Sequence, residues 1–555
     1  MENTFMENYE NSAPGSQADG LKAETADNSG LPLGDMSPSL LSLKESPPDQ
    51  NTIRQQKLAP IQSSFLFFGG LSLAFGVMFT FCLFENPCGV TYPLFTVFAC
   101  FCGLAACRKL GVAVKRGSWF LIGTAILIGA STCRTADPFL VHLNGVALVL
   151  LGCVFAIHQF YDDCTWNIGK YLSSVFLYLC QCAGSVPVPF RHLQNYVGTR
   201  NNKALKHLPA ILAGFAAAIP VLALLVTLLS AADPVFSRFI GYVMGNILHP
   251  MFLAKLFLWT LFGTLALYCL VCGCCLHRLS ENNQNRARGS SLGAIAGLLG
   301  IALVYLIFSV IQIVYLFLGK GTLPEDYTYS EYARQGFFQL LAVSFFNLVM
   351  VLCSLKYIRP HRILNQILTL ICGCTYILIA SAAWRVILYV QEYHLSYLRL
   401  LCLWFLCLLA VLMAGVTWII WNRRFPLFGF CLTAVSVFYV ALAWARPDSV
   451  VAWDHVRHLD GQTATPADLF YLTRELGADG APAVASLNLD SLFFSQQGWD
   501  EDFDQMDQVW LNSYYDYYYD YHYWPECEEM GLRNYNFSFA QAKRPDLTKL
   551  FITRT

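Results

Sequence analysis

Two opposite charges stand directly before a long apolar stretch of the chain. In the segment TYSEYARQGFFQLLAVSFFNLVM, Glu331 and Arg334 are three residues apart, and the apolar run that follows is long enough to cross a bilayer. Residues at this spacing share one face of a helix, so the two side chains can form an ion pair. A charge near hydrocarbon is costly, and both residues are therefore candidates for a binding site or for a structural ion pair.

Other ionisable residues fall at the same predicted end of the apolar stretches. Together with Glu331 and Arg334, the predicted outer-leaflet polar cluster comprises Asp137, His142, Asp233, Arg238, Lys255, Arg385, Glu392 and Arg399. Such a cluster can recognise a headgroup, sugar or anion from the outside, or it can orient helices through structural ion pairs, and both interpretations stay open. We expect Glu331, Arg334 and Arg385 to converge with Asp233 or Glu392, because charges at similar depth are best held by one another.

No motif of known chemistry accompanies this cluster. The sequence has no Walker loop, G-x-S-x-G elbow, H-E-x-x-H helix, kinase motif set or dinucleotide fingerprint in a suitable setting. Glu85 or Asp137 could serve as the base of a membrane-embedded transferase, but an interfacial cap before a proline turn is the favoured interpretation of Glu85. The sequence therefore predicts no catalytic residue and no cofactor.

The 21 cysteines do not form a metal-binding pattern. Most lie in apolar segments, where a thiol behaves as a small hydrophobic group. C-x-C pairs such as Cys180 and Cys182 point to nearly opposite faces of a helix, so we predict no metal site. Cys88 and Cys133 fall in predicted outer loops, where a disulfide between them is allowed but not required.

Composition identifies the class of protein. Of 555 residues 56% are hydrophobic and 13% are charged, with a mean hydropathy of +0.46, which is typical of a polytopic membrane protein. Residues 61–446 carry 25 basic and 10 acidic residues, whereas both flanking segments are acidic. Acidic tails would repel a polyanion, so nucleic acid is excluded as a partner. The lipid bilayer is the predicted partner.

Hydropathy predicts an all-α integral membrane protein. A helix needs about 20 apolar residues to cross the hydrocarbon core, and this rule predicts eleven spans. They cover residues 64–84, 90–107, 118–133, 138–159, 209–231, 250–276, 293–318, 336–356, 365–390, 399–421 and 426–445. The interrupted segment near 170–190 is predicted to be interfacial or re-entrant. Gly293, Gly297 and Gly300 predict a small-residue packing stripe.

The basic residues of the loops predict the orientation. With the N-terminus inside, 17 of the 25 basic residues fall in inner loops, as expected for a plasma-membrane protein. Residues 1–60 are then a disordered cytoplasmic tail, and residues 447–555 are an acidic, Tyr-rich extracytoplasmic domain. Within this domain Pro466 and Asp468 begin a predicted helix that Gly477 ends. If the 170–190 segment spans the membrane, the C-terminal domain lies inside instead.

Four segments carry a resemblance to a known family. PEDYTYSEYARQGFFQL (324–340), WRVILYVQEYHLSYLRL (384–400), LLSAADPVFSRF (228–239) and DLFYLTRELGADGAPAVASL (468–487) resemble domain-of-unknown-function family 4173, which is close to family 4153. The similarity covers roughly residues 64–490. It implies a Gram-positive inner-membrane protein of the cell envelope without an assigned activity, and it transfers no functional residue.

Three functions follow as hypotheses. The first is a non-enzymatic scaffold, sensor or regulator of the cell envelope, because no catalytic motif is present. The second is a transporter, or a carrier of lipids or headgroups, that uses the outer-leaflet polar cluster. The third is a membrane-embedded transferase. An envelope protein or a lipid headgroup is the expected further partner.

Overall fold

The computed structural model describes most of the chain between residues 50 and 541. The described residues are 50–86, 88–163, 166–199, 218, 225, 228–230, 233–242, 250–276, 291–314, 329–459, 463–464, 468, 470–486, 493–494 and 531–541. Contacts divide the chain into two units, Met1–Ile53 and Arg54–Thr555. The first unit is described only where α1 begins, and the other described elements all belong to the second.

Helix α1 (Gln50–Ser63) occupies part of the segment predicted to be a disordered tail. Leu58 and Ile61 are almost completely buried and join a core with Val188 and Leu267. This apolar face explains why residues 50–60 are helical. Residues 1–49 of the predicted tail lie outside the described residues.

The described part of the chain is predominantly helical, and nine of its helices are long and apolar enough to cross a membrane. They are α2 (Phe65–Leu83), α3 (Thr91–Lys109), α5 (Pro138–Phe160), α11 (Pro250–Leu276), α12 (Ser291–Gln312), α13 (Tyr329–Tyr357), α14 (Arg362–Tyr393), α15 (Tyr397–Trp421) and α16 (Leu427–Ala445). Each coincides with one of the eleven predicted spans, because a long apolar run has no other stable solution in a bilayer.

The two remaining predicted spans are not among these nine. Helix α4 (Arg116–Ser131) forms where the third was predicted, but its 16 residues make it too short to count as a span of its own. The fifth, 209–231, falls almost entirely outside the described residues.

The segment predicted to be interfacial or re-entrant forms two helices. α6 (Ile168–Ala183) and α7 (Pro187–Thr199) meet at a 42° bend, which is the geometry of a broken span or of a re-entrant loop. Pro187 cannot donate a backbone hydrogen bond, so the break falls directly before it. Tyr171, Tyr178 and Cys182 form the buried face of α6.

Close packing of α2 against α11 depends on two glycines. A Cβ atom on Gly76 would lie 2.5 Å from the Thr260 carbonyl oxygen, and one on Gly263 would lie 3.0 Å from the Gly76 Cα. Small residues allow backbones in a membrane to approach in this way. The predicted stripe in α12 does not do so, because Cβ atoms on its glycines would meet nothing within 4 Å in the described structure.

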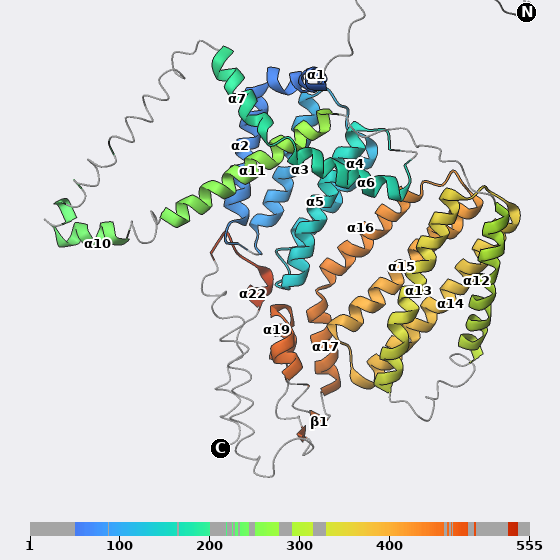
Figure 1. Ribbon diagram of the computed structural model, residues 1–555. Helices are drawn as coiled ribbons and strands as arrows, with labels where there is room; N and C mark the ends of the chain where they lie inside the picture. The colour runs from blue at the N-terminus through green and yellow to red at the C-terminus, as the bar shows by residue number, and fades with distance from the viewer. Residues whose placement is uncertain are drawn as a thin grey trace, which may run out of the picture. The chain divides into compact units, whose positions relative to one another are not determined.

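Helices α12 to α16 are consecutive in the chain and lie together on one side of the bundle (Figure 1). Leu368, Ile371 and Met413 are completely buried in the core that α12 to α15 share. Within it, the Asn347 side chain of α13 donates a 3.0 Å hydrogen bond to Thr375 of α14.

The described residues after α16 form short elements against one end of the bundle (Figure 1). They are α17 (Pro447–Leu459), η3 (Tyr471–Glu475), η4 (Ala478–Gly480), α19 (Ala481–Ala485) and α22 (Phe537–Gln541), with a parallel pair of β1 (Thr463–Ala464) and β2 (Phe493–Phe494). Their core includes Cys88, which lies between α2 and α3, and Val141 of α5. In the helix predicted to end at Gly477, Asp468 and Phe470 are α-helical and the last turn is the π-helical turn η3.

Candidate functional site

Asp137, one of the predicted site residues, begins α5 and is 4% exposed. Its Oδ1 accepts hydrogen bonds from the backbone amides of Phe139 at 2.9 Å and Leu140 at 3.4 Å, as an N-cap residue does. Its Oδ2 accepts a 2.5 Å hydrogen bond from the Tyr397 hydroxyl. Burial raises the pKa of Asp137, although these hydrogen bonds oppose the increase.

Tyr397 carries the connection onward to the C-terminal elements. It is the first residue of α15, and its backbone amide donates to the Tyr471 hydroxyl of η3 at 3.1 Å. Asp137, Tyr397 and Tyr471 therefore link the starts of two membrane helices to a short helix after α17.

A second carboxylate, Asp479 of η4, is completely buried. It accepts hydrogen bonds from the Thr135 hydroxyl at 2.5 Å and from the Ser538 hydroxyl, and it forms a 3.1 Å ion pair with Arg446. Arg446 also donates to Gln541 of α22 at 3.2 Å. Through these contacts, the Asp479 carboxylate connects the α4–α5 turn, the end of α16 and α22.

A third carboxylate, Asp448, lies in the first turn of α17 and is 6% exposed. It accepts a 3.0 Å hydrogen bond from the Gly477 amide. A Cβ atom at Gly477 would lie 2.8 Å from the carboxylate oxygen, so a larger residue there would require the Asp448 side chain to shift. Burial, reinforced by the charges of Asp137 and Asp479, raises the pKa of Asp448 to about 7.

We call Asp137, Asp448 and Asp479 the acid triad, and the place where it joins the membrane helices to the C-terminal elements the junction. Among the described residues, Arg446 is the one basic side chain in an ion pair with the triad. Three buried carboxylates against one guanidinium leave excess negative charge, which a bound proton on the triad relieves.

A strap of residues 531–541 crosses the junction. The Val90 amide donates to the Tyr535 carbonyl at 2.9 Å, and the Phe537 amide donates to the Cys133 carbonyl at 3.0 Å. Asn536 is completely buried and donates to the Thr135 carbonyl at 2.9 Å. The strap therefore fastens the α2–α3 and α4–α5 turns to the Asp479 site.

Three histidines border the junction where α14 turns into α15. The His394 ring centroid lies 5.6 Å from that of His455 and 4.7 Å from that of His458. His455 Nε2 donates to the Leu395 carbonyl at 2.8 Å, and the Leu395 amide donates to Asp454 at 3.0 Å. Burial lowers the pKa of His455, so this ring is neutral at pH 7.

The other predicted site residues are spread over the bundle. Arg399 donates to the Tyr393 carbonyl at 2.7 Å and to the His394 carbonyl, so it caps the end of α14. Arg385 lies 3.5 Å from the Gln312 side-chain oxygen and packs against Gly336 of α13.

The remaining predicted residues have exposed or undescribed side chains. His142, Glu392, Asp233, Arg238 and Lys255 are exposed or partly exposed. The side chains of Glu331 and Arg334 lie outside those described. The convergence of this pair with Arg385 stays a prediction.

Sequence reasoning missed four residues of the junction: Tyr397, Arg446, Asp448 and Asp479. A weak signal was present, since Asp137 and Asp448 each adjoin a proline at the start of a helix. The described residues contain no group of three His, Cys, Asp or Glu side chains that could hold a metal ion.

In the part of the chain that the structure describes, nine bilayer-length helices and a buried polar junction define a multi-pass membrane protein. The chain belongs to the family described as Domain of unknown function (DUF4153), which matches residues 122–487. This family is close to family 4173, which the four segments of the sequence resemble. The matched range includes the acid triad, Tyr397 and Arg446 and stops before the strap. No curated protein and no solved structure matches the chain.

Proposed function

We propose that this protein is a non-enzymatic sensor or regulator of the cell envelope. Its C-terminal region docks on the membrane-spanning helices, and the binding of a proton to the acid triad controls this docking. The observation that carries the proposal is the acid triad, whose three carboxylates are at most 6% exposed. A docking surface held by hydrophobic contact alone would not need buried acids. The protein lies in the plasma membrane, with residues 447–555 extracytoplasmic and residues 1–60 cytoplasmic.

The distribution of basic residues supports this orientation. Helices α3, α4, α13, α14 and α15 have Lys or Arg at or just beyond the end that is distant from the junction. These residues are Arg108, Lys109, Lys115, Arg116, Lys356, Arg359, Arg362, Arg423 and Arg424. Because positively charged loops stay in the cytoplasm, the junction belongs to the opposite side.

Protonation would act through Asp448. The titratable and charged groups that face it are Asp137 from α5, Asp479 from η4, Tyr397 from α15, Tyr471 from η3 and Arg446 beside Asp479. A carboxyl whose pKa is higher when docked than in water binds a proton on docking. Docking is therefore favoured at low pH and weakens as the pH rises through about 7.

A transporter or headgroup carrier is the alternative. It requires a cavity that brings a substrate to the polar residues, whereas the triad is buried and its oxygens accept hydrogen bonds from the protein. A transferase with Asp137 as base meets the same difficulty, since both oxygens of Asp137 are engaged. Proton-controlled docking requires only that the acids are buried, so it needs no cavity for a substrate.

Hydrogen exchange of the purified full-length protein between pH 5.5 and 8.5 tests the proposal. After correction for intrinsic exchange rates, amides of residues 447–486 should lose protection as the pH rises from 5.5 to about 7 and change little above it, whereas amides in the middle of α14 should not respond. Equal protection of residues 447–486 across this range would refute proton-controlled docking. Impermeant maleimide labelling of single cysteines at positions 10 and 550 in cells tests the orientation separately.

A further inference from the structure

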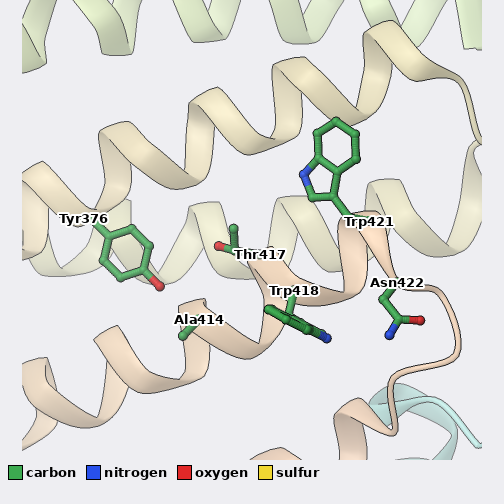
Figure 2. Close-up of a pocket in the computed structure, with 6 residues that line it drawn as sticks. All are labelled: Tyr376, Ala414, Thr417, Trp418, Trp421 and Asn422. Carbon is green, nitrogen blue, oxygen red and sulfur yellow. The ribbon is translucent and has the colours of Figure 1, made fainter.

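A groove between α14 and α15 lies far from the junction. It has a volume of about 530 Å³ and is lined by Tyr376 of α14 and by Ala414, Thr417, Trp418, Trp421 and Asn422. Figure 2 shows Tyr376 at one end of this groove and Trp421 with Asn422 at the other. Ala414, Trp418 and Trp421 follow one helix face, and the small Ala414 side chain leaves the space between them.

The groove begins where α15 ends and runs toward the middle of the bundle. Trp418 and Trp421 are 61% and 62% exposed, and tryptophans at the end of a spanning helix favour the headgroup layer. The seven helical steps from Ala414 to Trp421 correspond to ~10 Å of helix. The groove therefore connects the headgroup layer with the hydrocarbon region.

Three polar side chains along its wall already form hydrogen bonds within the protein. Trp421 donates to Thr369 at 3.0 Å, the Tyr376 hydroxyl donates to the Ala410 carbonyl at 3.3 Å, and Thr417 donates to the Met413 carbonyl at 2.8 Å. What remains for a ligand is mainly hydrocarbon contact. An acyl chain fits this lining, whereas a sugar or a free anion does not.

Positive charge stands at the open end of the groove. Arg423 donates to the Leu355 carbonyl at 3.2 Å and to the Asn365 side-chain oxygen at 3.4 Å. Asn365 is one helical turn from Thr369, the partner of Trp421, so the guanidinium and the indole lie on the same face of α14. Arg424 follows directly and is exposed.

We propose that this groove binds an anionic phospholipid, with one acyl chain between Tyr376 and Trp418 and the phosphate at Arg423 and Arg424. The charge complementarity between the two arginines and a lipid phosphate carries this choice of occupant. The site is separate from the acid triad, and the inference does not rest on the proposed sensing function.

Native mass spectrometry of the full-length protein, released from detergent with defined lipids, provides the test. Phosphatidylglycerol should be retained more strongly than phosphatidylcholine with the same acyl chains. The double variant Arg423→Gln, Arg424→Gln should weaken phosphatidylglycerol retention by about tenfold, the effect of losing a charge-assisted contact. Arg108→Gln, Arg116→Gln, which removes two exposed charges at the same end of the bundle, should leave retention unchanged.

A second variant separates a lost site from a lost fold. Ala414→Leu keeps every charge and fills the groove, so it should lower phosphatidylglycerol retention without lowering the thermal unfolding midpoint. Equal retention of both lipids, or equal effects of the Arg423, Arg424 and Arg108, Arg116 pairs, would overturn the proposal and leave only non-specific annular lipid.

Discussion

The Tyr397 hydroxyl donates a 2.5 Å hydrogen bond to Asp137, 260 residues earlier in the chain. This bond joins the first residue of α15 to the cap of α5. Asp137 also caps α5, so the same carboxylate both stabilises the start of α5 and fixes the position of α15 beside it. Loss of the phenol therefore affects both helices.

Tyr397→Phe should destabilise the protein by about 2 kcal/mol, because it removes a hydrogen bond to a buried charged group. Tyr393→Phe is the matched control, since the Tyr393 side chain is exposed and contacts Tyr389 through its ring. Thermal unfolding of the two variants in the same detergent measures the difference. Equal midpoints would mean that the Asp137 contact contributes nothing.

Arg446→Gln should be more damaging, with a loss of about 3 kcal/mol or more, because it leaves the buried Asp479 carboxylate without its cation. The exposed Arg457 on α17 provides the control, and Arg457→Gln should change stability little. The double variant Arg446→Gln, Asp479→Asn should recover part of the loss. A double variant as unstable as the sum of both singles would contradict a direct coupling.

Asp448→Asn should flatten the dependence of stability on pH. In the native protein the pKa of Asp448 is about 7, above its ordinary value, so stability falls as the pH rises from about 4 to 7. Each pKa unit of difference corresponds to about 1.4 kcal/mol. The variant should therefore be more stable than the native protein at pH 8 and similar to it at pH 4.

Thermal midpoints at half-unit pH steps measure this effect. Asp454→Asn, on the same helix but with a partly exposed carboxylate, is the control and should leave the profile intact. If Asp448→Asn retains the native slope between pH 5 and 7, the proton binds elsewhere in the junction.

Gly76→Ala should separate α2 from α11 and destabilise the bundle by about 1 to 3 kcal/mol, because the added methyl group would meet backbone atoms of α11. Gly70→Ala on the same helix is the control, because a Cβ atom there meets nothing within 4 Å. It should be neutral or slightly stabilising, as alanine favours helix formation. Unfolding midpoints of equal value for the two variants would show that the close approach is unimportant.

Hydropathy was sufficient for the nine bilayer-length helices, since the need to satisfy every backbone group in lipid dominates local preferences. It also placed Asp137 correctly at the start of a span. Hydropathy could not predict that Asp448 and Asp479 lie close to Asp137. Their proximity depends on the left-handed backbone of Arg446 and on the turn at Gly477. The same limit explains the glycines, as nothing local distinguishes Gly76, which packs, from Gly297, which does not.

The strap has a consequence for biogenesis. Asn86 and Arg533, which meet across the junction, are 447 residues apart in the chain. During synthesis α2 and α3 enter the membrane long before residues 531–541 leave the ribosome. The turn between these helices must wait with buried polar groups such as Asn86 incompletely covered. A chaperone or quality-control protease would thus have a natural period in which to distinguish an unfinished chain from a finished one.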